Sequence, residues 1–236
     1  GRARASAPGF ADTTVPYGGG RPKTAGPAPI GKQLTNGNKV ELDQGNAAGG
    51  IGGKYKDNLE VVDSQYQPQT AVQLYNATKG KVVAFVQILG TGVMNAILPL
   101  LKTDNLVAGP ATLDSGWVKE QQLMALGAPY QIQAINAMDW WVNQKGNKDS
   151  TVCLMRQNDP YGEAGKEGLE VAGTQMSFKS AKEVTFAATD TDYSAQANKP
   201  KAATCTPVAP TGMPTRTGGL SVPPPPRGGT PPTSGQ

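Results

Sequence analysis

The strongest constraint on the fold is an apolar run at residues 81–89, KVVAFVQIL, which ends in Gly90-Thr91-Gly92. The run is rich in β-branched residues and too short for a typical helix, so it predicts a strand buried on both faces, as in the parallel sheets of α/β proteins. A helical pattern begins at Val93. Backbone N–H groups at the glycine turn are therefore expected at a helix N-terminus, where anionic groups bind favourably.

The alternation of strand and helix recurs along the chain. Pro99 is expected to kink or end the helix that begins at Val93, near Leu98. Strands that alternate with helices indicate an α/β fold in which helices flank parallel sheets. Further strands are predicted at residues 58–63, 106–108, 151–155 and 181–186, and further helices at residues 69–78, 131–144 and 163–175.

Turns that follow the strands of a parallel sheet lie at its carboxyl edge, where ligands bind in open α/β folds. Two such turns are Leu89-Gly90-Thr91 and Pro110-Ala111-Thr112. We expect them to present backbone groups and hydroxyls at one edge. A polar connection at residues 157–163, QNDPYGE, follows a later strand and is expected to face the ligand edge as well.

Glycine and proline are concentrated at the two ends of the chain. Residues 1–25 contain Pro16 and Pro22 around a run of glycines, so they are predicted to form an irregular arm. Residues 199–236 include four consecutive prolines from Pro223 and are predicted to be a disordered tail. The region between them can bury a core, although its first helix, over residues 32–48, is expected to be weak and broken by glycines.

The composition excludes several function classes. The chain contains no histidine, which excludes Ser-His-Asp and Cys-His catalysis and imidazole-ligated metals. The net charge is +4 and no run of Lys or Arg is interleaved with aromatic residues, so no nucleic-acid partner is indicated. No stretch approaches the ~20 apolar residues that a membrane span requires. Cys153 and Cys205 could form one disulfide, but the favoured interpretation is that they are two inert thiols.

Two interpretations of the glycine turn compete with a small-solute site. Gly90-Thr91-Gly92-Val93-Met94-Asn95 is close to the dinucleotide-binding fingerprint, with Asp114 about where the ribose-binding acid is expected. Asn95, however, occupies the third glycine position. In the second interpretation, Gly90 and Gly92 merely turn a strand into a helix and bind nothing.

Four motifs together resemble those of one family. They are NAAGGIGG at residues 46–53, DSQYQP at 63–68, QNDPYGE at 157–163 and TDYS at 191–194. In order and spacing, over roughly residues 26–198, the chain resembles the type I periplasmic binding proteins, and most of all the leucine/isoleucine/valine-binding receptors of ABC transporters. The resemblance implies two Rossmann-like lobes joined by a hinge. In this chain the first lobe would comprise residues 26–128, and residues 129–198 would form part of the second lobe.

The resemblance also implies a function and a site. The protein would act outside the cytoplasm, without cofactor, metal or catalytic residues, and deliver an amino acid or similar solute to an ABC permease; a lipid anchor in an uncleaved precursor stays open. Leu89-Gly90-Thr91 and Pro110-Ala111-Thr112 would hold the α-carboxylate and α-ammonium. The Thr91 and Thr112 hydroxyls suit a carboxylate, and the Pro110 carbonyl suits an ammonium. Tyr161 would cover the ligand from the opposite lobe; the alternative is a tyrosine on a surface turn.

The resemblance ends near Ala197, where the family continues for well over half as many residues again. The abrupt change in composition after Asn198 predicts a truncated or frame-shifted homologue. A third hypothesis follows, in which the chain is a non-binding remnant.

Overall fold

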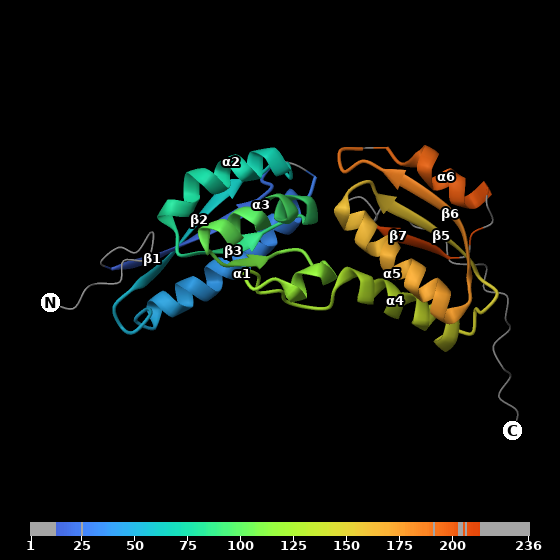
Figure 1. Ribbon diagram of the computed structural model, residues 1–236, viewed down its shortest axis with the longest axis horizontal. Helices are drawn as coiled ribbons and strands as arrows, with labels where there is room; N and C mark the ends of the chain where they lie inside the picture. Colours follow the sequence, from blue (N-terminus) through green and yellow to red (C-terminus); the bar gives the residue numbers. More distant parts are fainter. Residues whose placement is uncertain (1–12, 25, 191, 203–204, 206, 213–236) are drawn as a thin grey trace, which may run out of the picture.

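Two parallel sheets, each covered by helices, lie side by side along the long axis of the molecule (Figure 1). The computed structural model describes residues 13–24, 26–190, 192–202, 205 and 207–212. The α/β fold predicted from the sequence, with helices on parallel sheets, is confirmed. None of the helices in the described part of the chain combines the length and the apolar character needed to cross a membrane.

The first lobe is a four-stranded sheet in the order β2-β1-β3-β4. Its helices pack on both sides of the sheet (Figure 1). The strands are β1 (Thr14–Arg21), β2 (Lys56–Asp63), β3 (Ala84–Ile88) and β4 (Ala108–Pro110); the helices are α1 (Ala28–Ala47), α2 (Pro68–Thr78), α3 (Thr91–Asp104) and the short 3₁₀ turns η1 (Lys79–Lys81) and η2 (Ser115–Lys119).

The second lobe is a three-stranded sheet in the order β6-β5-β7. The helices α4 and α5 lie next to each other on one face of this sheet, and α6 lies beside β6 (Figure 1). The strands are β5 (Thr151–Gln157), β6 (Lys179–Phe186) and β7 (Val208–Thr211); the helices are α4 (Tyr130–Asp139), its continuation as a π-helix η3 (Trp140–Gln144), α5 (Pro160–Met176) and α6 (Ser194–Ala202).

Each lobe has its own apolar core. In the first lobe the core lies between β3 and the helices α2 and α3, and in the second between β5 and the helices α4 and α5. The first core includes Tyr75, Val82, Phe85, Ile88, Val93, Met94, Ile97 and Leu101, and the second Met138, Val142, Val152, Leu154, Leu169, Ala172 and Phe178.

The prediction of an irregular arm over residues 1–25 is wrong for residues 14–21, which form β1 between β2 and β3. The Pro16 carbonyl accepts a hydrogen bond from the Val83 N–H at 2.9 Å, so the proline is accommodated in the ladder. A Cβ on Gly18 would lie 2.5 Å from the Phe85 ring. The glycine therefore lets a core aromatic ring lie directly on the strand, which is a tertiary requirement that composition does not reveal. Residues 1–12 lie outside the described part.

Two helices are longer than the sequence predicted. The helix α1 runs through Gly37 and Gly45 without a break. It is anchored by the buried Gln87 of β3, whose side-chain oxygen accepts from the Thr35 hydroxyl at 3.2 Å and from the Asn38 amide at 2.9 Å. The helix α3 likewise continues past Pro99 to Asp104, because its face of buried apolar residues stays in the first core.

The prediction of a disordered tail from residue 199 is wrong for the described residues up to 212. The helix α6 extends to Ala202, and β7 pairs with β5 in parallel. Cys153 and Cys205 form a disulfide, so the expectation of two inert thiols is also wrong. Their Cα atoms are 5.5 Å apart because β7 lies beside the strand that carries Cys153. Residues 213–236 lie outside the described part.

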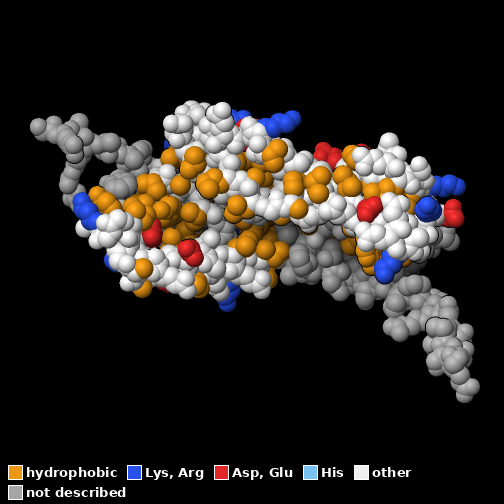
Figure 2. Space-filling view, turned by 90° about the horizontal axis from the view of Figure 1, so that it is seen from below, with side chains coloured by type: hydrophobic (Ala, Val, Ile, Leu, Met, Phe, Trp, Pro, Cys, Tyr) orange, Lys and Arg blue, Asp and Glu red, His pale blue; other side chains and the backbone are white. Residues whose placement is uncertain are grey.

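Apolar side chains gather on the first lobe in the face seen from below (Figure 2). Exposed large apolar residues include Leu34 and Val40 on α1 and Met124 and Leu126 between η2 and α4. Trp140 of η3 is 49% exposed, whereas the indole N–H of the neighbouring Trp141 donates to the Ser150 hydroxyl at 2.8 Å. The helix α4 and its continuation η3, which bury Met138 and Val142, are thus covered on one side only.

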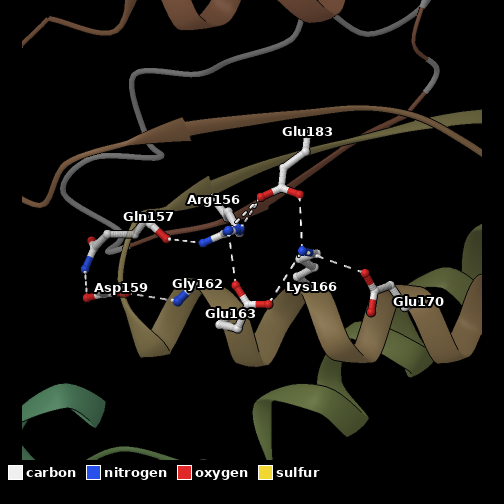
Figure 3. Close-up of polar contacts among 8 residues, drawn as sticks. All are labelled: Arg156, Gln157, Asp159, Gly162, Glu163, Lys166, Glu170 and Glu183. Carbon is white, nitrogen blue, oxygen red and sulfur yellow. Dashed lines mark hydrogen bonds and ion pairs between the residues drawn. The ribbon is translucent and has the colours of Figure 1, made fainter.

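An ion network fastens α5 to the second sheet (Figure 3). The side chain of Arg156, 11% exposed, contacts Glu183 of β6 at 2.6 Å and Glu163 of α5 at 3.1 Å. Lys166 lies 3.5 Å from Glu183 and 3.6 Å from Glu163. Both carboxylates are thereby shared between two cations, which orients α5 over β5 and β6.

Acid is expected to weaken this network. Burial by itself raises the pKa of Glu183, but the hydrogen bond and charge of Arg156, followed by Lys166, outweigh it and lower the pKa. A lowered folded-state pKa stabilises the fold above the unfolded-state pKa, and this contribution is lost as the pH falls through the folded-state value. We expect the Tm to fall between pH 7 and pH 3, and to fall less in Glu183→Gln, as measured by circular dichroism. Glu60→Gln, at an exposed position of β2, is the control; an identical pH dependence in all three proteins would contradict the prediction.

Candidate functional site

The site is built on the carboxyl edge of the first sheet, where β3 and β4 end. The Ala111 N–H donates to the Ile88 carbonyl at 2.8 Å, so the two turns that follow these strands lie side by side. The helix α3 begins at Thr91 after Gly90, which has a φ of 112° and provides no side-chain cap. A Cβ on Gly90 would lie 2.7 Å from the Tyr66 ring, so both the backbone conformation and the close approach require glycine.

Three hydroxyls meet at this edge. The hydroxyl oxygens of Thr91 and Thr112 are 2.8 Å apart, and both threonines are buried. The Tyr130 hydroxyl, from the start of α4, donates to the Thr112 hydroxyl at 3.3 Å. The hydroxyl cluster therefore lies at the N-terminus of α3, where the helix dipole favours negative charge.

Tyr161 approaches the same place from the second lobe. Its ring packs against the edge of the Tyr130 ring with centroids 4.7 Å apart, and its hydroxyl donates to the Gly212 carbonyl at 3.4 Å. Burial, followed by the neighbouring Tyr130 and Asp159, raises the pKa of Tyr161 to about 12. The phenol is therefore neutral at physiological pH and presents an uncharged ring.

These groups surround a pocket of about 110 Å³. Six of the seven residues that the sequence indicated line it, and their role in binding stays a prediction. Pro110 does not line the pocket; it is buried in β4, in register with Ile88 of β3. The lining residues are Ile30, Tyr66, Leu89, Gly90, Thr91, Ala111, Thr112, Tyr130 and Tyr161.

Three of these residues were missed by the sequence interpretation. Tyr66 belongs to the motif DSQYQP, so the signal was present but was not connected with the site. Tyr130 directly precedes a predicted helix, and Ile30 lies in the first turn of α1. No local pattern distinguishes these two from ordinary packing residues.

Tyr66 also connects the two lobes. Its φ of 59° is in the left-handed region, which is unfavourable for a bulky residue. Its hydroxyl donates to the Asp159 carboxylate of the second lobe at 3.1 Å. Asp159 caps α5 by accepting from the Gly162 N–H at 3.0 Å, and it also accepts from the Gln157 side-chain amide (Figure 3). Burial, followed by the charge of Asp159, raises the pKa of Tyr66, so this bridge holds its proton.

Asp114, expected near a bound dinucleotide, is not at the glycine turn. Its carboxylate accepts from the Gly116 N–H at 2.8 Å and caps η2. It lines a separate, open cavity together with Asn95 and Arg156. Within the described ranges, no group of three or more Cys, Asp or Glu side chains is arranged to hold a metal ion.

The chain is similar to known proteins in sequence and in fold. The family model described as "Periplasmic binding protein" matches residues 18–217. No curated protein matches the sequence at a significant level. The fold is similar to that of a fatty acid ABC transporter substrate-binding protein from Thermomonospora curvata, which is 23% identical, with 90% of this chain and 55% of that one covered and a TM-score of 0.86.

Two further solved structures share the fold at lower identity. A branched-chain amino acid ABC transporter protein from Thermus thermophilus with bound valine is 15% identical, with 86% of this chain and 53% of that one covered and a TM-score of 0.76. A solute-binding protein of an ABC transporter from Rhodopseudomonas palustris in complex with 3,4-dihydroxybenzoic acid is 16% identical, with coverages of 88% and 56% and a TM-score of 0.77. The chain spans about half the length of these proteins. Because the family model matches most of the sequence, the chain belongs to the periplasmic binding protein family and has its type I fold, as the motifs predicted.

Proposed function

We propose that the chain is the solute-binding component of an ABC transporter and acts outside the cytoplasm, where it captures a small carboxylate-bearing solute for a permease. The observation that carries the proposal is the hydroxyl cluster of Thr91, Thr112 and Tyr130 at the N-terminus of α3, closed off by Tyr161 from the other lobe. Solute-binding proteins of this family capture ligands and perform no chemistry on them, so no enzymatic activity is proposed.

The described residues supply the parts of a capture mechanism. The uncapped N–H groups at the start of α3 and the threonine hydroxyls would hold a carboxylate. Closure of the two lobes would bring Tyr161 over the bound solute, and the bridge from Tyr66 to Asp159 would stabilise the closed state. The branched-chain amino acids suggested by the sequence are one class of such solutes, and the valine, fatty acid and aromatic acid named for the three structural relatives all carry a carboxylate.

Thr112→Val is expected to lower carboxylate affinity by about 10-fold or more, because a hydrogen bond to a charged group is lost and the Tyr130 hydroxyl loses its acceptor. Isothermal titration calorimetry with leucine and 4-methylpentanoate measures the effect. Thr103→Val, on the exposed face of α3, is the control and should bind as the wild type does.

Two outcomes would contradict the proposal. If NAD binds and Gly90→Val abolishes that binding, the glycine turn serves a dinucleotide instead. If neither NAD nor any carboxylate binds to the wild-type chain, the chain is a non-binding remnant.

A further inference from the structure

A cavity separate from the solute pocket lies within the second lobe, between the helices α4 and α5 and the strands β5 and β7. The volume of this second-lobe cavity is about 210 Å³, compared with about 110 Å³ for the pocket at the edge of the first sheet. Tyr130 and Tyr161 are the two described residues that line both spaces, and their rings pack against each other. This tyrosine pair therefore forms the boundary between the pocket and the cavity.

The floor of the second-lobe cavity is apolar. Met138 of α4, Leu154 of β5 and Leu169 of α5 are buried there and belong to the core of the second lobe. Among the lining residues that the structure describes, none is an Asp, Glu, Lys or Arg. A ligand that enters therefore meets mainly apolar surface and no formal charge.

Most polar side chains of the lining form hydrogen bonds outside the cavity. Tyr130, Gln133 and Tyr161 donate to the Thr112 hydroxyl, the Ala128 carbonyl and the Gly212 carbonyl respectively. Thr211 adds one more hydroxyl, and its side chain lies against Gly165. The lining thus leaves aromatic faces and methyl groups as its principal contacts for a ligand.

Small residues create this space, and close contacts beside it keep it open. The small residues on α4, α5 and β7 that line the cavity are Ala134, Ala137, Gly165 and Ala209. A Cβ on Gly165 would lie 2.7 Å from the Thr211 Cβ, and a Cβ on Gly168 would lie 2.9 Å from the Ala134 Cβ. Because α5 already touches both β7 and α4, these elements cannot move inward to fill the cavity.

The second-lobe cavity is open to solvent on one side. Gln133 and Ala137 of α4 and Pro210 of β7 are exposed, whereas the residues of the floor are buried. A small molecule can therefore enter between α4 and β7 without unfolding of the lobe.

An apolar cavity is unfavourable when it is empty, because its lining atoms lack dispersion contacts on one side. A water molecule needs several polar partners, which most of this lining does not offer, whereas apolar cavities of about 150 Å³ bind benzene. We propose that the second-lobe cavity is a binding site for a small neutral apolar molecule of about the size of a single aromatic ring. The site does not depend on the proposed solute function, because among the described residues it shares only the tyrosine pair with the solute pocket.

Toluene, a neutral molecule with one ring, tests the proposal by NMR in the full chain with ¹³C-labelled methionine methyl groups. We expect the Met138 methyl resonance to shift on titration, because a bound toluene ring would lie against the floor of the cavity. Met94, buried in the core of the first lobe, is the internal reference and should not shift. The expected Kd is about 1 mM or tighter, which is within the range that a ligand of this size reaches.

A matched pair of variants locates the bound toluene. Ala137→Leu places a larger side chain at the open side of the cavity, and Ala137 does not line the solute pocket. We expect this variant to bind toluene at least about 10-fold more weakly, because the leucine side chain and the ligand would occupy the same space. Asn136→Leu adds the same side chain to the exposed surface of α4 outside the cavity and should bind toluene as the wild type does.

Each outcome of this comparison either supports or overturns the second site. Weaker toluene binding in Ala137→Leu alone, together with the Met138 shift in the wild type, supports it. Equal toluene affinity in the two variants, or a wild-type chain that does not bind toluene, would overturn it. Titration with 4-methylpentanoate tests the proposed function separately, so either proposal can fail while the other stands.

Discussion

Gly162→Ala is expected to lower the free energy of unfolding by about 3 kcal/mol or more, because the new methyl group has nowhere to go. A Cβ at this position would lie 1.8 Å from the backbone oxygen of Gln157 and 2.8 Å from its carbonyl carbon. Gln157 is fully buried at the end of β5, so the strand cannot move away. The helix α5 would have to shift instead, and it carries both Tyr161 and the residues of the ion network.

Urea unfolding followed by circular dichroism measures this loss. Gly37→Ala is the matched control, since Gly37 lies in the exposed part of α1 and no atom lies within 4 Å of the place that an added methyl group would take. The control should be more stable than the wild type by about 0.5–1 kcal/mol, because alanine favours the helix and restricts the unfolded chain. A Gly162→Ala protein with wild-type stability would show that α5 does not approach β5 as closely as described.

Removing the disulfide is expected to lower the free energy of unfolding by about 4 kcal/mol. The bond restricts the unfolded chain by closing a loop between two cysteines separated by 52 residues in the sequence. Cys153 is fully buried in the central strand β5, and its N–H donates to the Pro207 carbonyl at 3.1 Å. The bond therefore holds the short strand β7 against the sheet. The Gly212 carbonyl, directly after β7, accepts a hydrogen bond from the Tyr161 hydroxyl. Loss of the disulfide should therefore also loosen the side of the pocket that the second lobe provides.

The test compares the wild type with the double variant Cys153→Ala/Cys205→Ala in urea, with and without dithiothreitol. Reductant should destabilise the wild type to about the level of the double variant and leave the double variant unchanged. Thiol titration with Ellman's reagent in denaturant reports whether the bond was reduced. Full reduction with no loss of stability would contradict the assigned role of the disulfide.

The candidate site was predictable to the extent that it depends on chain order. Leu89, Gly90 and Thr91 follow one strand and Ala111 and Thr112 follow another, and in a parallel sheet such turns must meet at one edge. These five residues accordingly line one pocket, and Tyr161, which the family resemblance implied, is the sixth of the seven predicted residues to line it. Pro110 was misplaced because β4 begins and ends two residues later than the apolar pattern indicated, which puts Pro110 inside the strand.

The residues that complete the pocket were not predictable in the same way. Tyr130 lines it because the chain enters the second lobe there, and its ring meets that of Tyr161 from a different helix. Tyr66 lines it because a left-handed turn directs its ring over Gly90. These positions depend on contacts between segments far apart in the sequence, for which a single sequence has no signal.

By itself, the sequence determined the α/β class, the family and the turns that form the sheet edge, because these depend on local periodicity and on motifs of fixed spacing. Only the tertiary structure decided that residues 14–21 form a central strand and that residues 208–211 form an edge strand. Glycine and proline disfavour strands locally, yet the Phe85 ring packs on Gly18 and the disulfide holds β7 in place. Both contacts join residues far apart in the sequence. The folded chain therefore stabilises two strands that the local propensity of their residues disfavours.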